Sequence, residues 1–246
     1  MVKIKINTLL LNKSKSAFEI TWNDVKDDYH EAVGGDIQNG KAFFVWSKRL
    51  NAWIKIVSRE FSTYSQISID RVIWETVAVL DDEGILWLLT SRKNFYKVQD
   101  DIKRGKVTHY MYLLTSNNPD YAEQLAFDGL SKNDYFQKQR LEQAKKILGD
   151  DFSKIVQTQI IVFDYTSNLA LNGSIILVDN QFNVLEEQSI SNSVFLPQTS
   201  NDEVSALEFD DENQDTDRED ILVSWKNPDK DNPNDNNSIK KETESN

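Results

Sequence analysis

Apolar and polar residues along the first 70 positions form patterns that predict both strands and a helix. Residues 2–6 alternate, and residues 24–32 follow a capping position at Thr21 or Asn23 and precede Gly34, which predicts a capped helix. Residues 52–62 also alternate between apolar and polar side chains, and residues 41–47 before them supply the other strand of a hairpin. The predicted elements are an opening strand, a second short strand, a helix and a β-hairpin, at residues 2–11, 18–22, 24–32 and 41–62.

The middle of the chain contains two kinds of segment: apolar runs, and segments whose apolar residues fall on one side of a helix. Two apolar runs at residues 69–80 and 85–90 enclose the polar turn at 81–84, which predicts a hairpin. Residues 92–104 predict a helix that places Phe95, Val98 and Ile102 on its core side. The remaining predicted elements are a strand at 107–114, a helix that begins at 118–119, and a strong helix at 133–148 that ends at Gly149.

Antiparallel strands complete the body, with predicted positions 155–165, 169–171, 174–178 and 184–190. The dipeptide Asn172-Gly173 predicts a tight two-residue turn between the second and third of these strands. The turns at 81–84 and 179–182 resemble each other, and shared turn rules are a sufficient reason for this likeness. The patterns therefore predict an α+β fold: a mainly antiparallel sheet with three to four helices over residues 1–200.

Composition removes several kinds of chemistry. The chain has no Cys and two His, so it lacks thiol nucleophiles, disulfides and thiolate metal sites. No phosphate-binding glycine loop and no Gly-x-Ser-x-Gly motif occurs in it. We interpret the carboxylate groups at 24–31 and 81–83 as a solvated helix face and a polar turn. We therefore expect no catalytic activity, cofactor or metal, with an enzyme of an unrecognised class as a less favoured alternative.

The net charge of −12 is concentrated at the carboxyl end. Residues 1–150 carry 22 basic and 20 acidic side chains, whereas residues 201–246 carry 5 and 15. Because the latter segment combines few core-forming residues with high charge, it predicts a disordered acidic tail after the body. The first 150 residues are slightly basic, so the negative net charge of the whole chain does not exclude an anionic ligand for the body.

Aromatic and cationic side chains alternate in the predicted hairpin at 41–62. One strand face carries Trp53, Lys55, Arg59 and Phe61, which Trp46 and Arg49 extend on the other strand and its connection. Bases stack on aromatic rings while Lys and Arg follow phosphates, so this pattern predicts a single-stranded nucleic-acid site. In the alternative interpretation the rings pack beneath a helix, with the cations at the rim or paired with the rings.

The tail contains a short apolar cluster between acidic runs, formed by Ile221, Leu222, Val223 and Trp225. Such a cluster predicts a docking motif for a protein partner, or alternatively a segment that packs on the body itself. A β-rich body joined to an acidic tail resembles the organisation of phage and bacterial single-stranded-DNA-binding proteins. No sequence motif carries that resemblance, and the terminal residues 244–246 lack the acidic run with an apolar tip found in the bacterial proteins.

The sequence thus predicts a non-enzymatic binding protein. The specific hypothesis is a single-stranded nucleic-acid-binding accessory protein whose acidic tail regulates access and recruits partners. The alternative is an assembly, adaptor or inhibitory factor that docks proteins through its tail or body. No apolar run has the length of a signal peptide or a membrane span, so we expect no membrane partner and a cytoplasmic location.

Overall fold

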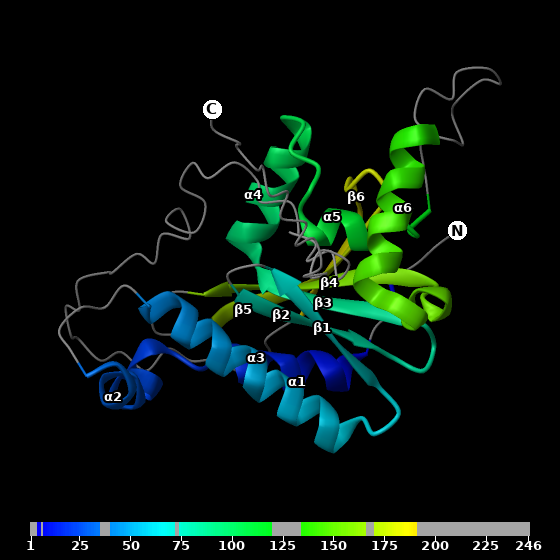
Figure 1. Cartoon of the computed structure of the whole chain (residues 1–246). Coiled ribbons are helices and arrows are strands. Elements are labelled where there is room, and N and C mark those ends of the chain that lie inside the picture. Colours follow the sequence, from blue (N-terminus) through cyan, green and yellow to red (C-terminus); the bar gives the residue numbers. More distant parts are fainter. Residues whose placement is uncertain are drawn as a thin grey trace, which may run out of the picture.

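A mixed sheet lies at the centre of the protein and is covered by helices on both faces (Figure 1). The computed structural model describes residues 4–5, 7–34, 40–71, 74–119, 134–165 and 170–190. The helices are α1 (Thr8–Phe18), α2 (Trp22–Val33), α3 (Lys41–Glu60), α4 (Arg92–Lys103), α5 (Tyr110–Leu114), α6 (Asp134–Leu148) and the short 3₁₀ helix η1 (Gly149–Lys154). The strands are β1 (Ser65–Arg71), β2 (Trp74–Leu80), β3 (Ile85–Ser91), β4 (Gln157–Tyr165), β5 (Ala170–Val178) and β6 (Val184–Ile190).

The strands are ordered in the sheet as they follow in the chain, from β1 to β6. Strands β1, β2 and β3 form one antiparallel meander, and β4, β5 and β6 form a second. Strands β3 and β4 join the meanders and run parallel, so the chain crosses between them through α4, α5 and α6. The α+β class is confirmed, with six α-helices in the described part of the chain rather than three or four.

Two cores lie on opposite faces of the sheet. One face packs against α4, α5 and α6, which contribute Phe95, Met111 and Leu148 to its core. The other face packs against α1 and α3, which contribute Phe18 and Trp53. Helix α2 packs on α3. The central strand β3 is buried along its whole length. Its nearly continuous apolar sequence is typical of a strand that is covered on both faces.

The turns that follow β2 and β5 share one hydrogen-bond pattern. In each, the first carboxylate accepts the backbone N–H groups two and four residues later, from Asp81 in one turn and Asp179 in the other. The fourth position has a positive φ, 82° at Gly84 and 68° at Phe182. A side chain in this region costs about 1–2 kcal/mol, so Phe182 stands where Gly is the usual residue. The two meanders therefore share the same turn structure after their second strands.

The helix over residues 24–32 is confirmed as α2. The Thr21 backbone N–H donates to the Asp24 carboxylate at 2.7 Å in a capping box, and Gly34 ends the helix with a φ of 66°. The helices predicted at 92–104 and 133–148 are confirmed as α4 and α6. Their one-sided apolar stripes span several turns, and for that reason they identify the elements unambiguously.

The predicted strands at 2–11 and 107–114 contain helices. The strand at 2–11 is wrong because α1 begins at Thr8, where the Asn7 side chain caps it by accepting the Leu10 N–H at 2.9 Å. The strand at 107–114 is wrong because α5 occupies residues 110–114, all of them buried. A short apolar run that is buried throughout has no periodicity that separates helix from strand.

The turn predicted at Asn172-Gly173 is also wrong, because both residues lie inside β5. Gly173 pairs with Phe163 of β4 and with Ile190 of β6, so pairing on both sides keeps this dipeptide extended. The short strand predicted at 18–22 is wrong too, since Phe18 ends α1 and Trp22 begins α2. The tail at 201–246 lies outside the described residues. In the described part of the chain, no helix has the length and apolarity needed to cross a membrane.

Candidate nucleic-acid interface

The hairpin predicted at residues 41–62 is wrong, because a single helix, α3, occupies residues 41–60. Its buried positions recur every three or four residues, with Arg49 and Leu50 adjacent: Lys41, Val45, Arg49, Leu50, Trp53 and Val57. The flanking positions Ala52, Ile54 and Ile56 are partly buried against the same core. A broad helical stripe of this kind produces local alternation over residues 52–57, which imitates a strand. The strand face that carried the predicted site therefore does not exist.

The two aromatic rings at the centre of that prediction belong to the core. Trp53 is fully buried, and its indole Nε1 donates a hydrogen bond to Ser14 Oγ at 2.9 Å. Phe61 follows the helix, is 9% exposed, and stacks on Tyr64 with the ring centroids 4.8 Å apart. Neither ring is placed to stack on a base. The rings are buried, as the alternative interpretation expects, but Trp53 lies on helix α3 itself and not on a strand beneath a helix.

Arg49 and Trp46 contact each other in the α1–α3 layer. The Arg49 guanidinium lies 5.7 Å from the Trp46 ring centroid and 5.3 Å from that of Phe18. Its Nε donates to the carbonyl of Ile20 at 2.9 Å, and the residue is 3% exposed. Burial and these contacts assign Arg49 to the packing of α3 on α1.

Lys55 and Arg59 are the members of the predicted set that are exposed on α3. Arg59 Nε lies 2.8 Å from the carboxylate of its neighbour Glu60. Elsewhere on the helix, Lys48 pairs with Asp28 of α2 at 2.6 Å. Helix α3 thus uses much of its positive charge within the protein.

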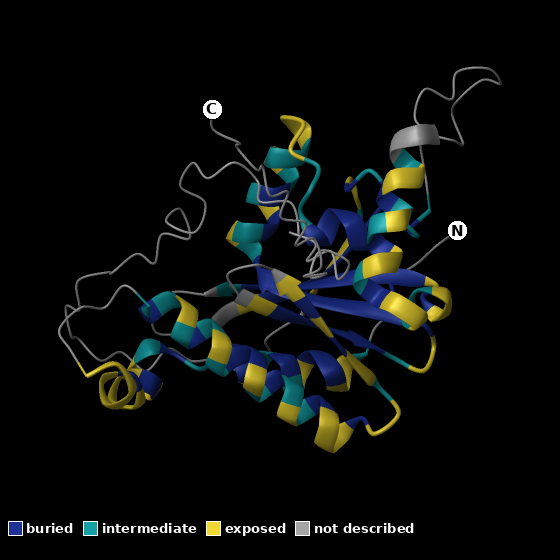
Figure 2. Cartoon of the chain, in the orientation of Figure 1, coloured by how far each residue is buried: buried dark blue, intermediate teal, exposed yellow. Residues whose placement is uncertain are grey.

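Helix α4 and the turn after it form a second basic surface. Residues 92–106 carry six basic and two acidic side chains, a net charge of +4. The residues that we call the α4 surface are Lys93, Tyr96, Lys97, Lys103, Arg104 and Lys106. At 100° per residue the helical members lie within roughly 120° of arc, opposite the buried Phe95 and Val98. Figure 2 shows exposed residues at the end of α4 and in the following turn.

Tyr96 is 41% exposed, and it is the aromatic member of the α4 surface. Its ring contacts Phe95 edge-on at 5.3 Å. The ion pairs at the end of the helix are long, with 3.6 Å both from Lys103 to Asp100 and from Lys106 to Asp101. Such exposed pairs contribute about 0–1 kcal/mol each, so a stronger anion replaces them at small cost.

The Arg104 guanidinium has no hydrogen bond or ion pair with any of the described residues. The sequence pattern contained the signal for this surface. Once Phe95, Val98 and Ile102 are assigned to the core, the same helical periodicity places Tyr96 and the cations outside. The interpretation missed it because it searched for interleaved aromatic and basic residues on a strand.

Arg92 anchors the beginning of α4 to three strands. Its Nε donates to Asp164 of β4 at 2.8 Å, Nη1 to Glu187 of β6 at 2.5 Å, and Nη2 to Ser174 of β5 at 2.6 Å. Although burial opposes it, hydrogen bonding to Glu187 and Asp164 raises the pKa of Arg92. Ser91 caps the helix by accepting the Asn94 N–H at 3.1 Å. These contacts fix α4 rigidly and leave its far end exposed.

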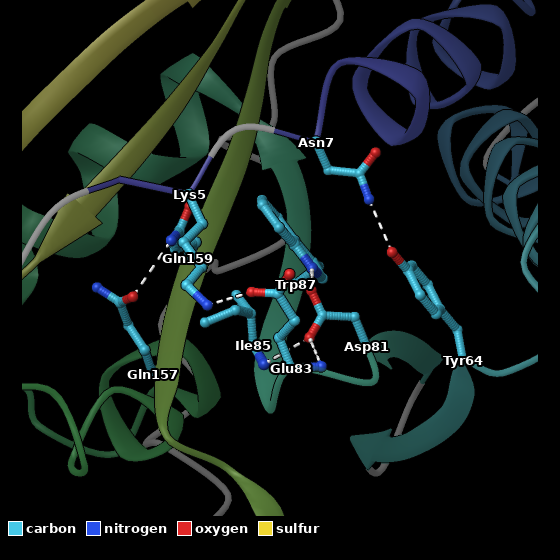
Figure 3. A network of polar contacts seen from close by, with 9 residues as sticks. All are labelled: Lys5, Asn7, Tyr64, Asp81, Glu83, Ile85, Trp87, Gln157 and Gln159. Carbon is cyan, nitrogen blue, oxygen red and sulfur yellow. Dashed lines mark hydrogen bonds and ion pairs between the residues drawn. The ribbon is translucent and has the colours of Figure 1, made fainter.

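A polar network at the opposite end of the sheet surrounds the turn after β2 (Figure 3). Asp81 Oδ1 accepts the N–H groups of Glu83 and Ile85, at 3.0 and 2.8 Å, and Oδ2 accepts the Trp87 indole N–H at 2.9 Å. Its carboxylate thus accepts three hydrogen bonds from the turn and the strand that follows. These bonds give Asp81 a structural role in the turn.

The N-terminal segment closes over this network. Lys5 pairs with Glu83, and Asn7 donates to the Tyr64 hydroxyl at 2.7 Å. With its amide oriented by its partners, Gln159 accepts the Lys5 N–H at 3.0 Å and donates to the Lys5 carbonyl at 3.1 Å. Burial and the charges of the acidic turn raise the pKa of Tyr64. This end of the sheet is thus closed by the chain itself.

Arg140 is a third polar centre, buried under α6 at 2% exposure. Its guanidinium donates to the carbonyls of Asn180, at 2.5 Å, and Tyr112, and lies 3.6 Å from the Tyr112 ring centroid. Its Nε has no partner, and burial lowers the pKa of Arg140 to about 10. The residue joins α6 to α5 and to the turn after β5, so its role is structural.

The two histidines lie at different helices. His30 is exposed on α2, and His109 precedes α5, where Nδ1 accepts the Met111 N–H at 3.3 Å. In the described part of the chain, no three His, Cys, Asp or Glu side chains gather as a metal site requires. The docking residues Ile221, Leu222, Val223 and Trp225 lie outside the described residues.

Together these features define a three-layer α+β protein built on two antiparallel meanders, with a basic helix anchored at one end of its sheet. The chain belongs to DUF5986, a family of unknown function whose model matches residues 3–242. It matches no curated protein and no solved structure.

Proposed function

We propose that this protein is a non-enzymatic, cytoplasmic binding protein that holds single-stranded nucleic acid on the α4 surface. The observation that carries the proposal is an exposed tyrosine, Tyr96, among cations on one face of a rigidly anchored helix. A base stacked on such a ring contributes about 1–3 kcal/mol, while lysine and arginine neutralise the neighbouring phosphates. The site moves from α3, where the sequence interpretation placed it, to α4.

The two helices differ in what their cations already contact. Arg49 of α3 is buried between aromatic rings, and Lys48 and Arg59 pair with carboxylates at 2.6 and 2.8 Å. On α4 the corresponding pairs of Lys103 and Lys106 are longer, at 3.6 Å. An incoming phosphate at the end of α4 displaces only these long pairs, and it gains charge-assisted hydrogen bonds to Arg104.

Fluorescence anisotropy with a short labelled oligothymidine at low salt tests the proposal on the full chain. We expect Lys103→Gln combined with Arg104→Gln to weaken binding about tenfold and to reduce the salt dependence, because fewer counterions are released. Tyr96→Ala is expected to weaken binding by about fivefold or more through the lost stacking. The matched control, Lys55→Gln with Arg59→Gln on α3, removes the same charge and should change binding by less than about twofold.

Two results would overturn this proposal. The first is the absence of saturable oligothymidine binding by the wild-type chain at ~50 mM salt, where phosphate contacts are strongest. The second is an equal loss of affinity in the α3 control and the α4 variant. An equal loss would mean that binding depends on the total charge of the protein and not on the α4 surface.

Protein docking through the tail is a second candidate function, favoured by the apolar residues Ile221, Leu222, Val223 and Trp225 between acidic runs. A strand or helix formed on binding would use these side chains as anchors. Affinity purification with the full chain tests it: Trp225→Ala is expected to lose a partner that Phe209→Ala, a control in the same tail, retains. Retention of every partner by Trp225→Ala would remove this candidate.

A further inference from the structure

The chain leaves the sheet beside the beginning of α4. Strand β6 ends at Ile190, three residues after Glu187, whose carboxylate accepts a hydrogen bond from Arg92 at 2.5 Å. Because Arg92 is the first residue of α4, the end of β6 at Ile190 lies near the anchored end of that helix. The α4 surface extends from this point toward Lys106.

The segment that follows is complementary in charge to the α4 surface. Residues 201–220 carry ten acidic side chains and one basic side chain, a net charge of −9, against +4 for residues 92–106. Carboxylates, like phosphates, accept charge-assisted hydrogen bonds from Lys and Arg. The acidic segment and a nucleic-acid backbone would therefore use the same donors: Lys103, Arg104 and Lys106.

The length of the connection permits this contact. The acidic residues at 208–220 follow Ile190 by 18–30 positions, and a random coil of that length spans roughly 23–33 Å. Helix α4 has 12 residues and is therefore about 18 Å long. The acidic segment reaches the far end of α4 without full extension. Tethering at this range gives an effective concentration of about 1 mM, so even a weak contact is populated.

We propose that the acidic segment 201–220 binds the α4 surface of its own chain and competes there with nucleic acid. This regulation rests on the proposed function of the α4 surface. At an effective concentration of about 1 mM, a segment with an intrinsic Kd of 0.1–1 mM weakens nucleic-acid binding by about two- to tenfold. The tail thereby raises the nucleic-acid concentration needed to occupy the α4 surface by the same factor.

Charge neutralisation within the full chain tests the competition. The variant carries Asp210→Asn, Asp211→Asn, Glu212→Gln, Glu219→Gln and Asp220→Asn. Its matched control carries the same change of charge farther along the tail: Asp229→Asn, Asp231→Asn, Asp235→Asn, Glu242→Gln and Glu244→Gln. We expect the first variant to bind oligothymidine about two- to tenfold more tightly than the control. Equal affinities would overturn the competition.

Carbodiimide cross-linking of the wild-type chain without nucleic acid tests the contact separately. This reagent joins a carboxylate to an amine, and mass spectrometry locates the amide formed. We expect residues 201–220 to link to Lys103 and Lys106 in preference to the exposed Lys26 and Lys55, and this preference to disappear in ~1 M salt, where charges are screened beyond about 3 Å. An even distribution of links among these lysines would overturn the contact.

The two experiments separate the possible failures. Preferential links to Lys103 and Lys106 without oligothymidine binding by any variant would overturn the proposed function, and with it the competition. Oligothymidine binding that depends on Lys103 and Arg104, without preferential links, would overturn the regulation alone.

Discussion

Replacement of Arg140 tests what holds α6 on the sheet. This guanidinium is 2% exposed, bonds two backbone carbonyls, and lies against the Tyr112 ring. It forms no ion pair within the described residues, since its hydrogen-bond acceptors are carbonyls and the Gln137 amide. Methionine replaces the stem of arginine as far as Nε and carries no charge, whereas lysine keeps the charge and loses the planar fork. The two variants therefore separate charge from geometry.

The magnitude follows from opposing contributions. Burial lowers the pKa of Arg140 to about 10, and at ~1.4 kcal/mol per pKa unit the buried charge costs about 3 kcal/mol. Arg140→Met removes this cost but leaves the Asn180 carbonyl without its donor, at about 2 kcal/mol. The Tyr112 carbonyl keeps the Thr115 hydroxyl at 3.0 Å, so its loss is about 1 kcal/mol. With about 2 kcal/mol for the lost cation–ring contact, the net destabilisation is about 2 kcal/mol.

Arg140→Lys should be more destabilising than Arg140→Met, at about 4 kcal/mol. An ammonium reaches one of the two carbonyls at most, and it is more strongly hydrated than a guanidinium, so its burial costs more. Urea denaturation followed by circular dichroism measures both free energies of unfolding. Lys138→Met, at an exposed position of the same helix, is the control and should change stability by less than about 0.5 kcal/mol. A lysine variant as stable as the wild type would refute the desolvation argument.

Three further predictions concern the rest of the fold. Gly84→Ala should cost at least about 2 kcal/mol more in urea denaturation than Gly105→Ala, because both have a positive φ but only at Gly84 would the new Cβ lie 2.6 Å from a backbone oxygen. Ser14→Ala leaves the buried Trp53 indole N–H unpaired and should cost about 2 kcal/mol by the same assay, with altered tryptophan fluorescence; unchanged stability would show that this hydrogen bond is dispensable. The raised pKa of Tyr64 means that the folded state binds this proton more tightly, so stability is lost as pH rises through the folded pKa, and Tyr64→Phe should flatten the decline in alkaline unfolding curves.

Local signals were sufficient where several agreed within one element. Helix α2 combines a capping box at Thr21, an acidic first turn and a left-handed glycine at its end, so the sequence predicted a helix at 24–32, within the observed Trp22–Val33. The turn at Asp81 is flanked by two apolar runs and contains Gly84, and the hairpin there is confirmed. In each case the periodicity and the end signals predict the same structure.

Helix α3 was missed because its stripe contains both charged and half-buried apolar residues. Arg49 occupies a core position since its guanidinium lies over the Phe18 ring and donates to a backbone carbonyl, an arrangement that only the folded chain brings together. When Arg49 is counted as polar, the helical stripe is broken, and the alternation at residues 52–57 becomes the stronger pattern. The same effect hid Arg140, which occupies a core position of α6.

The parallel pairing of β3 with β4 could not be predicted from local patterns either. The sequence of each strand also suits an antiparallel partner, and the relative direction of the two strands is set by the crossover through α4, α5 and α6. That crossover is what places α4 above the sheet and its basic face in solvent. The candidate site thus depends on a long-range feature, although the residues that form it were readable in the helix pattern.

The two ends of the sheet differ in what covers them. At one end lie both aspartate turns, the N-terminal segment over Gln159 and the buried Arg140, and the side chains of Asp81, Asp179, Gln159 and Arg140 bond to the backbone around them. At the other end Arg92 ties the start of α4 to three strands, and β6 ends beside it. A closed end provides rigidity, and the opposite end then holds a charged helix in a fixed position at little entropic cost. This division is the physical reason to look for a ligand on α4, and it explains why removing charge there should alter binding and leave the folding free energy nearly unchanged.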